Sequence, residues 1–175
     1  MVPRPRDIQP ERESCLIRKC GEDNREAIFI VINEAAKAYK DLIPKDRYSE
    51  PYMPMPDLRN EMGKMTFFGY EEEGKLLGVA GYQQVKDVTL VRHVYVLSEQ
   101  QRRGVGSQLL NQTIQVANTR RVLVGTWQAA TWAIRFYEKH GFKLQPEKDR
   151  LLREYWRIPE RQIQLSVVLG IEKTP

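Results

Sequence analysis

A basic glycine turn at residues 101–107 places the strongest constraint on how this chain can fold. The segment reads Gln-Arg-Arg-Gly-Val-Gly-Ser and lies between an apolar, β-branched run that ends at Val96 and a segment from Val105 whose apolar residues recur at helical spacing. This pattern predicts a strand, a tight turn and the start of a helix. Because the first amides of a helix lack intrahelical partners and carry partial positive charge, we expect the turn to hold a phosphate group.

The spacing of the glycines separates three kinds of phosphate-binding loop. A P-loop requires a lysine directly after its last glycine, where this chain has Ser107. A dinucleotide-binding loop requires a third glycine, where this chain has Leu109, and an acidic residue about 20 positions further on, where it has none. The remaining pattern is Gln/Arg-x-x-Gly-x-Gly/Ala, which Gln101, Gly104 and Gly106 match. Glycine at these positions lets the backbone turn tightly and approach a ligand closely.

The flanking segments extend this match over nearly the whole chain. Residues 94–99 read as a strand followed by a short polar link, and residues 121–124 read as the next strand. Residues 132–142 contain the pattern Ala-x-x-Phe-Tyr-x-x-x-Gly-Phe. Together with the glycine loop, these segments resemble the GNAT superfamily of acyl-CoA N-acyltransferases. The resemblance runs from about Leu16 to Leu169.

The resemblance implies an α/β (α+β) fold of the GNAT type. Its single mixed, mainly antiparallel sheet has six to seven strands, is flanked by helices and is splayed between the fourth and fifth strands. We expect a flexible arm over residues 1–14, one acetyltransferase domain over 15–170 and a tail over 171–175. Periodicity predicts strands at 16–18, 65–70, 76–85, 88–96, 121–127 and 162–169, and helices at 23–43, from 105, at 131–140 and at 150–156. Asp23 and Glu26 resemble a capping box, and Gly141 stands where a left-handed helix cap is expected.

The cofactor implied by the resemblance is acetyl-CoA, with coenzyme A as product and no metal. The loop residues expected to hold its diphosphate are Arg102, Arg103, Gly104, Val105, Gly106 and Ser107. The main chain of Val94, Tyr95 and Val96 is expected to pair with the pantetheine arm and to offer an amide to the developing oxyanion. Residues 100–137 contain no Asp or Glu but five arginines, a local charge that suits a compact polyanion. A basic face for nucleic acid is the alternative, although no recognition motif accompanies it.

Tyr137 is the candidate general acid, because it occupies the tyrosine of the helix signature. The alternative is a core aromatic residue packed beside Phe136. Some GNAT members carry a carboxylate or His on the fourth strand facing the acceptor, and the matching positions here are Leu90 and Arg92, neither of which can serve as a base. His93 has a suitable pKa but the opposite strand parity, so no general base is evident. Many GNAT members carry an asparagine just before this helix, where this chain has Ala130. The hydroxyl of the next residue, Thr131, could replace that contact or cap the helix.

The acceptor site is expected to involve residues 46–62, a connector rich in Pro, Tyr and Met. In GNAT proteins the corresponding region forms one wall of the acceptor pocket. Tyr48, Tyr52 and Met53 are therefore the candidate substrate-binding residues, although such side chains could equally cover core. The helical insertion at 150–159 departs from the family pattern and could shape the acceptor site or a homodimer contact.

Three function classes follow from these observations. The first is an N-acetyltransferase that transfers an acetyl group from acetyl-CoA to a primary amine, on a small molecule or a protein, by direct attack in a ternary complex. The second is a non-catalytic acyl-CoA-binding protein of the same fold, and the third is a basic nucleic-acid-binding module. No apolar stretch is long enough to span a bilayer, so we expect no membrane partner. The close pair Cys15 and Cys20 favours reduced thiols and a cytoplasmic location.

Overall fold

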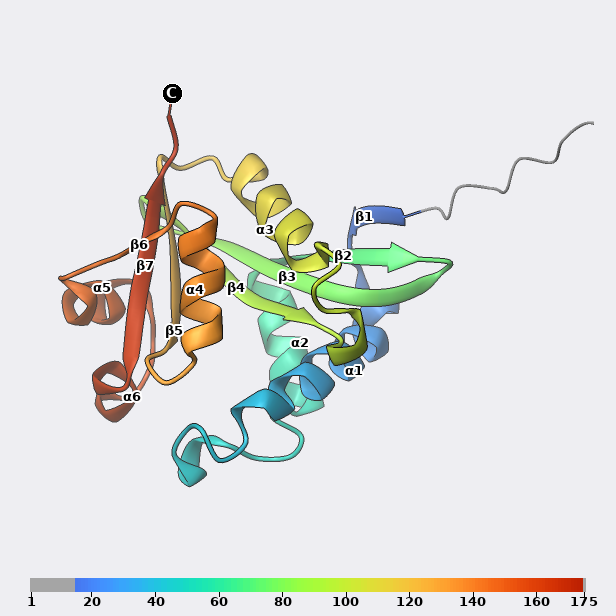
Figure 1. The fold of residues 1–175 in the computed structure, drawn as a ribbon, viewed down its shortest axis with the longest axis horizontal. Coiled ribbons are helices and arrows are strands. Elements are labelled where there is room, and N and C mark those ends of the chain that lie inside the picture. The colour runs from blue at the N-terminus through green and yellow to red at the C-terminus, as the bar shows by residue number, and fades with distance from the viewer. Residues whose placement is uncertain (1–14, 175) are drawn as a thin grey trace, which may run out of the picture.

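The protein is built on a seven-stranded mixed sheet with the order β1-β2-β3-β4-β5-β7-β6 and with helices on both faces (Figure 1). The computed structural model describes residues 15–174, so the arm expected over 1–14 lies outside the described residues. The strands are β1 (Cys15–Lys19), β2 (Thr66–Glu72), β3 (Lys75–Val85), β4 (Val88–Val96), β5 (Arg121–Trp127), β6 (Lys143–Leu144) and β7 (Ser166–Glu172). The helices are α1 (Arg25–Ala35), α2 (Met55–Lys64), α3 (Val105–Val116), α4 (Thr131–Lys139), α5 (Lys148–Tyr155) and α6 (Glu160–Gln164). The predicted fold class is confirmed.

Strands β1 to β4 form a continuous antiparallel half of the sheet. The β2–β3 hairpin turns through Glu73 and Gly74, whose φ angles are 51° and 76°. Two successive left-handed residues match the right-handed twist of the strands that they connect. This hairpin joins the two strands predicted at 65–70 and 76–85.

The sheet divides where β4 meets β5. These strands pair in parallel only over Val88–Val91 and Arg121–Val124. Beyond that point β4 continues beside β3, while β5 continues beside β7 in antiparallel pairing. The two halves therefore diverge, as Figure 1 shows, and the splay expected between the fourth and fifth strands is confirmed.

Apolar faces of the helices fix the two halves of the sheet. In α1 the buried residues Ile28, Val31, Ile32 and Ala35 follow helical spacing and pack with Leu58 of α2 against one face. Helices α3 and α4 cover the opposite face, and α5 and α6 bury Leu151, Leu152 and Ile163 against β4, β5 and β7. Each fully buried Leu or Ile side chain contributes roughly 1.5–3 kcal/mol.

The capping box predicted at the N-terminal end of α1 is wrong. Helix α1 begins at Arg25 after a 3-10 turn at Glu22–Asn24, and the side chain of Asn24 accepts a hydrogen bond from the Gly21 amide at 2.9 Å. The capping box of Asp23 and Glu26 is therefore not formed.

Residues 162–164, expected to start the last strand, instead lie in α6, which begins at Glu160 directly after Pro159. The alternation of Gln and apolar residues there also fits one helical turn that buries Ile163, and proline suits the entry to a helix. Strand β7 starts at Ser166 and ends at Glu172, so the expected domain boundary at 170 falls inside it. Gly141 has a φ of 87° and ends α4 in the left-handed conformation, as predicted.

Cys15 and Cys20 are both free thiols. Within residues 15–174, no helix combines the length and the apolar composition needed to cross a bilayer.

Candidate active site

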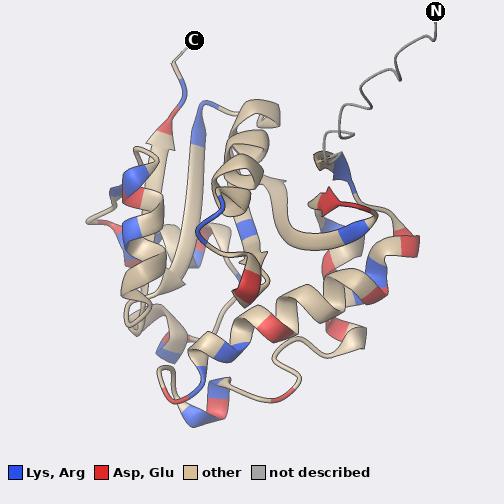
Figure 2. Cartoon of the chain, turned by 45° about the vertical axis from the view of Figure 1, so that its right-hand side comes forward, with Lys and Arg blue, Asp and Glu red and all other residues tan. Residues whose placement is uncertain are grey.

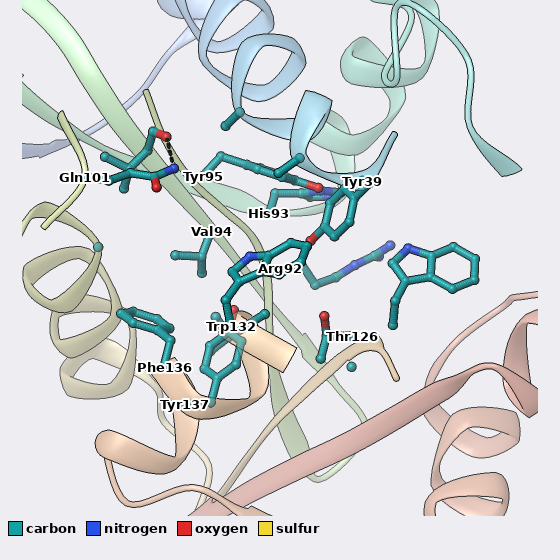
Figure 3. Close-up of a pocket in the computed structure, with 18 of the residues that line it drawn as sticks. Tyr39, Arg92, His93, Val94, Tyr95, Gln101, Thr126, Trp132, Phe136 and Tyr137 are labelled. Atoms are coloured by element: carbon teal, nitrogen blue, oxygen red, sulfur yellow. Dashed lines mark hydrogen bonds between the residues drawn. The ribbon is translucent and has the colours of Figure 1, made fainter. Parts of the chain in front are cut away.

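A cavity of about 610 Å³ opens where β4 and β5 diverge. Its walls come from the C-terminal half of β4, the loop 100–107, α3, β5, α4, the 3-10 turn Ala36–Tyr39 and the segment that follows α5 (Figure 3). This size lies within the range of small-molecule and cofactor sites, about 300–1,000 Å³. The cavity therefore joins the predicted phosphate loop to the predicted catalytic tyrosine, because Gly104, Gly106 and Tyr137 all line it.

The glycine loop presents free amides to this cavity. Gly104 has a φ of 81° and caps α3, a conformation that any residue with a side chain adopts at a cost. The first helical hydrogen bond is donated by the Gln108 amide to the Gly104 carbonyl at 3.0 Å. No described side chain caps this helix, so the amides of Val105, Gly106 and Ser107 lack helical partners. The arrangement fits the phosphate groups of coenzyme A.

The basic field expected from residues 100–137 is largely neutralised by acids from elsewhere in the chain. Arg103 does not line the cavity; it forms a forked ion pair with Glu72 of β2, with nitrogen–oxygen distances of 2.9 and 3.1 Å. Arg120 pairs with Glu172 at 3.3 Å, and Arg121 pairs with Glu147 at 3.2 Å. Basic and acidic positions accordingly lie near one another in several helices and loops of the chain (Figure 2). Of the two loop arginines expected to hold the diphosphate, only Arg102 lines the cavity.

The outer edge of β4 offers backbone groups to a ligand. Val94, Tyr95 and Val96 all line the cavity, beyond the last residue that pairs with β5. The Leu97 amide bonds to the Leu77 carbonyl of the β2–β3–β4 half at 2.9 Å, and amide direction alternates along a strand. The Val96 amide therefore points away from β3 and toward the opening, while the Val96 carbonyl accepts a hydrogen bond from Gln101 at 3.3 Å.

A β-bulge brings His93 to the cavity against the predicted strand parity. Between the pairs Gly81–Arg92 and Val79–Tyr95, two residues of β4 oppose one residue of β3. His93 carries the irregularity, with a φ of 55°. The extra residue places Arg92 and His93 on the same face, where both contact Glu61 of α2. The expectation that His93 lies on the opposite face of the strand from Arg92 is wrong, because strict alternation does not hold at a bulge.

Glu61 orients His93 and determines its tautomer. The His93 Nε2 atom lies 2.8 Å from Glu61 Oε2, and Arg92 Nη2 lies 3.4 Å from the same oxygen. His93 and Arg92 hold the pKa of Glu61 below its usual value despite burial, so Glu61 is an ionised acceptor. Nε2 must then donate, which leaves the lone pair on Nδ1. Burial lowers the pKa of His93, so the ring is neutral near pH 7.

Tyr137 lies on α4 with its side chain almost fully buried at 6% exposure. Its ring packs between Phe136 and Phe142, at centroid distances of 5.1 and 5.7 Å, so the core packing considered as an alternative is present. Its hydroxyl also points toward the middle of the cavity (Figure 3). Burial raises the pKa of Tyr137 above its ordinary value, so the phenol stays protonated.

Only one of the three expected acceptor residues reaches the cavity. Tyr52 lines it, whereas Tyr48 packs behind Tyr52 at a centroid distance of 6.1 Å and donates its hydroxyl to Glu50. Met53 is buried in the core beneath α1 and α2. A connector this rich in Tyr and Met supplies both wall and core, and composition does not separate the two uses.

Trp156 and Ile158 lie in the insertion at 150–159, the segment expected to shape the acceptor site or a homodimer contact, and both line the cavity. Tyr39 also lines the cavity, from the 3-10 turn after α1, and it has no signal in the sequence pattern. Glu61 could be found only by knowing that α2 packs against the bulge of β4. Ala130 is fully buried, and no side-chain hydrogen bond caps α4, so the Thr131 hydroxyl is not the helix cap.

Comparison with known proteins places these features in a family. The acetyltransferase (GNAT) family model matches residues 30–142, more than half of the chain. The PaiA N-acetyltransferase from Thermoplasma acidophilum in complex with coenzyme A is similar with a TM-score of 0.72 and 17% identity, over 91% of this chain and 99% of that chain. The ribosomal-protein-S18-alanine N-acetyltransferase from Escherichia coli is similar with a TM-score of 0.64 and 16% identity, over 91% and 94%. The two solved structures agree in fold, and the chain belongs to the acetyltransferase (GNAT) family.

Proposed function

We propose that this protein is an N-acetyltransferase that transfers an acetyl group from acetyl-CoA to a primary amine by direct attack in a ternary complex. One observation carries the proposal: a single cavity connects the free amides of α3 to a neutral, oriented histidine and a protonated phenol. A binding protein would need the first of these features alone.

The amides of Val105, Gly106 and Ser107 would hold the diphosphate, and the outer edge of β4 would align the pantetheine arm. Acetyl-CoA supplies an activated acetyl group on a thioester. The Val96 amide faces the opening and can donate to the oxygen on which negative charge develops. Preorganised donors of this kind stabilise a transition state without reorganising at the moment of reaction.

His93 is the proposed general base. Because the Nε2–H group donates a hydrogen bond to Glu61, the Nδ1 atom of His93 can accept the proton that the amine loses on forming the amide bond. The depressed pKa keeps that atom free of a proton at neutral pH, although it also makes the imidazole a weaker base. Glu61 opposes this loss of basicity and holds the ring in one orientation.

Tyr137 is the proposed donor to the departing sulfur. Its raised pKa makes full proton transfer to a thiolate of pKa about 8.5 unfavourable. We therefore assign it a hydrogen bond that strengthens as charge develops on sulfur. The proton taken by His93 passes to solvent, and the departing thiolate takes up a proton from solvent to give the thiol of coenzyme A, so transfer to a neutral amine has no net proton change.

The proposal is tested by measuring release of free coenzyme A with a panel of amines, together with equilibrium binding of acetyl-CoA. An enzyme releases thiol only when an acceptor is present. Binding without release with any amine would support the non-catalytic alternative. Binding of nucleic acid with no affinity for acetyl-CoA would support the third class.

A further inference from the structure

The cavity end that lies away from the glycine loop is strongly aromatic. Tyr39, Tyr52, Trp127 and Trp156 line it, with Ile158 beside them. Trp156 lies on Gly125 of β5, so closely that a Cβ atom at residue 125 would be 3.3 Å from the indole ring. The absence of a side chain at 125 thus lets the ring lie against the strand. These surfaces fit an acceptor with an apolar, aromatic body.

The charged side chains that line the cavity as a whole are all basic. Among residues 15–174, those that line the cavity include Arg92, Arg102 and Lys139 but no Asp or Glu. A polyamine or a lysine-rich peptide carries cations beyond the reacting amine, and burying such a cation without a counter-charge is costly. The cavity therefore disfavours polycationic acceptors and can accommodate an acceptor with a negative charge.

Arg92 is the cation placed at the acceptor end. Its side chain is 28% exposed and extends across the cavity between Tyr39 and Thr126 (Figure 3). Its polar partners in the described structure are Glu61 at 3.4 Å and Gln83 at 3.5 Å, both at the long end of the hydrogen-bonding range. A guanidinium has five donors in a planar fork, so Arg92 retains the capacity to bind a carboxylate in a bidentate manner.

The bulge of β4 brings this cation next to the proposed base. Arg92 and His93 are consecutive residues, and both contact the same oxygen of Glu61. A ligand that gives its amine proton to His93 and places an anionic group on Arg92 must carry these two groups close together. An α-amino acid has these groups on one carbon atom.

We propose, on the basis of the function proposed above, that the acceptor is an aromatic α-amino acid whose carboxylate binds Arg92 and whose ring lies against Trp156. The α-amino nitrogen forms a bond with the acetyl carbon, the carbon–sulfur bond breaks, and the amine proton leaves through His93. The products are an N-acetyl amino acid and coenzyme A.

The test compares acceptors that differ only in the carboxylate. Release of coenzyme A is measured with L-tryptophan and tryptamine, with L-phenylalanine and phenethylamine, and with spermidine and a lysine peptide. The expected result is a kcat/KM at least about 10-fold higher for each amino acid than for its decarboxylated partner. A preference for spermidine, for the lysine peptide or for the decarboxylated amines overturns the proposal while leaving the acetyltransferase function intact.

Arg92→Gln should remove this preference. It should lower the ratio of kcat/KM for L-tryptophan to kcat/KM for tryptamine from at least about 10 to about one, whatever the change in the rate common to both acceptors. Arg135→Gln, at an exposed position of α4 outside the cavity, is the matched control and should retain the preference. An equal loss of activity toward both acceptors in Arg92→Gln would mean that Arg92 does not bind the carboxylate.

A binding measurement separates failure of this proposal from failure of the proposed function. N-acetyl-L-tryptophan and N-acetyltryptamine are titrated into the wild-type protein and Arg92→Gln in the presence of coenzyme A. Tighter binding of the carboxylate-bearing product, lost in Arg92→Gln, supports the assignment even if no amine releases thiol. Equal binding of both products by the wild-type protein overturns it.

Discussion

The two ends of the cavity are built in different ways. The proposed cofactor end uses main-chain groups from one continuous segment, residues 94–107, held by a strand edge and a helix start. The proposed acceptor end uses side chains from β4, β5, the segment 39–52 and the segment after α5. A site made of backbone depends on conformation, whereas a site made of side chains depends on residue identity. The difference allows one fold to keep its cofactor while its acceptor changes.

The largest expected effect comes from His93, which lies between the two ends. His93→Gln should lower kcat by about 10²–10⁴-fold, the usual contribution of a general base, with little change in the affinity for acetyl-CoA. Steady-state kinetics combined with equilibrium binding would measure both. If the variant kept the wild-type rate, solvent and not His93 would be the group that deprotonates the amine.

The pH profile sharpens the role of Glu61. Burial lowers the pKa of His93, so kcat/KM should rise with pH along a limb centred below the ordinary histidine value of about 6.5. Because Glu61 raises the pKa of His93, Glu61→Gln should move this limb to lower pH and reduce the plateau. A limb at the same pH in both proteins would show that it reports another group.

A substitution at Gly106 tests the backbone site. Gly106→Asp should weaken binding of acetyl-CoA by about 100-fold or more, because its carboxylate repels the diphosphate and competes for the free amides. Gly106→Ala is the control: its Cβ would meet Phe136 at 3.5 Å and Val96 at 3.6 Å, which are ordinary contacts. Unchanged affinity in a folded Gly106→Asp protein would remove the phosphate-loop assignment. Calorimetric titration measures each case.

Tyr137→Phe should lower kcat by about 10-fold, the loss expected for one hydrogen bond to a developing charge. The affinity for acetyl-CoA should be nearly unchanged, because the ring still packs between Phe136 and Phe142. Single-turnover measurement isolates the chemical step. Equal rates at all pH values would assign Tyr137 to packing alone.

The smallest effect should come from Arg103, which supports the loop from outside. Arg103→Gln removes the pair with Glu72, a contact at the surface, and should weaken cofactor binding by about threefold or less. Arg102→Gln, at the cavity wall, should weaken it more. The reverse order would show that Arg103 turns into the cavity when the cofactor binds.

The fold and the strand–turn–helix geometry of the glycine loop could be predicted from the sequence because their signals are local. The glycine spacing, the strand ending at Val96 and the cap at Gly141 each depend on residues adjacent in the chain. The ion pairs of Arg103, Arg120 and Arg121 could not be predicted, because their acids lie far away in the sequence. The placement of Tyr48 and Met53 behind the wall depends on packing that composition does not specify.

The position of His93 failed to follow from the sequence for a different reason. Strand periodicity assigns faces correctly only while one residue opposes one residue, and the bulge breaks that count between Arg92 and Tyr95. Glu61 could not be predicted for the same reason. Its contact with His93 exists only because the bulge turns His93 to the face of the sheet that α2 covers. Helix α6 was obscured in a similar way, because its Gln and apolar residues alternate as a strand does.

The single additional residue in β4 makes the catalytic face sensitive to chain length as well as to chemistry. Deleting Val94 would restore one-to-one pairing between Arg92 and Tyr95, so that His93 would oppose Ala80 and turn to the other face of the sheet. Tyr95 and Val96 would keep their partners in β3, whereas His93 would lose its contact with Glu61. A shortening by one position could thus silence the site while every proposed catalytic side chain remained in the sequence.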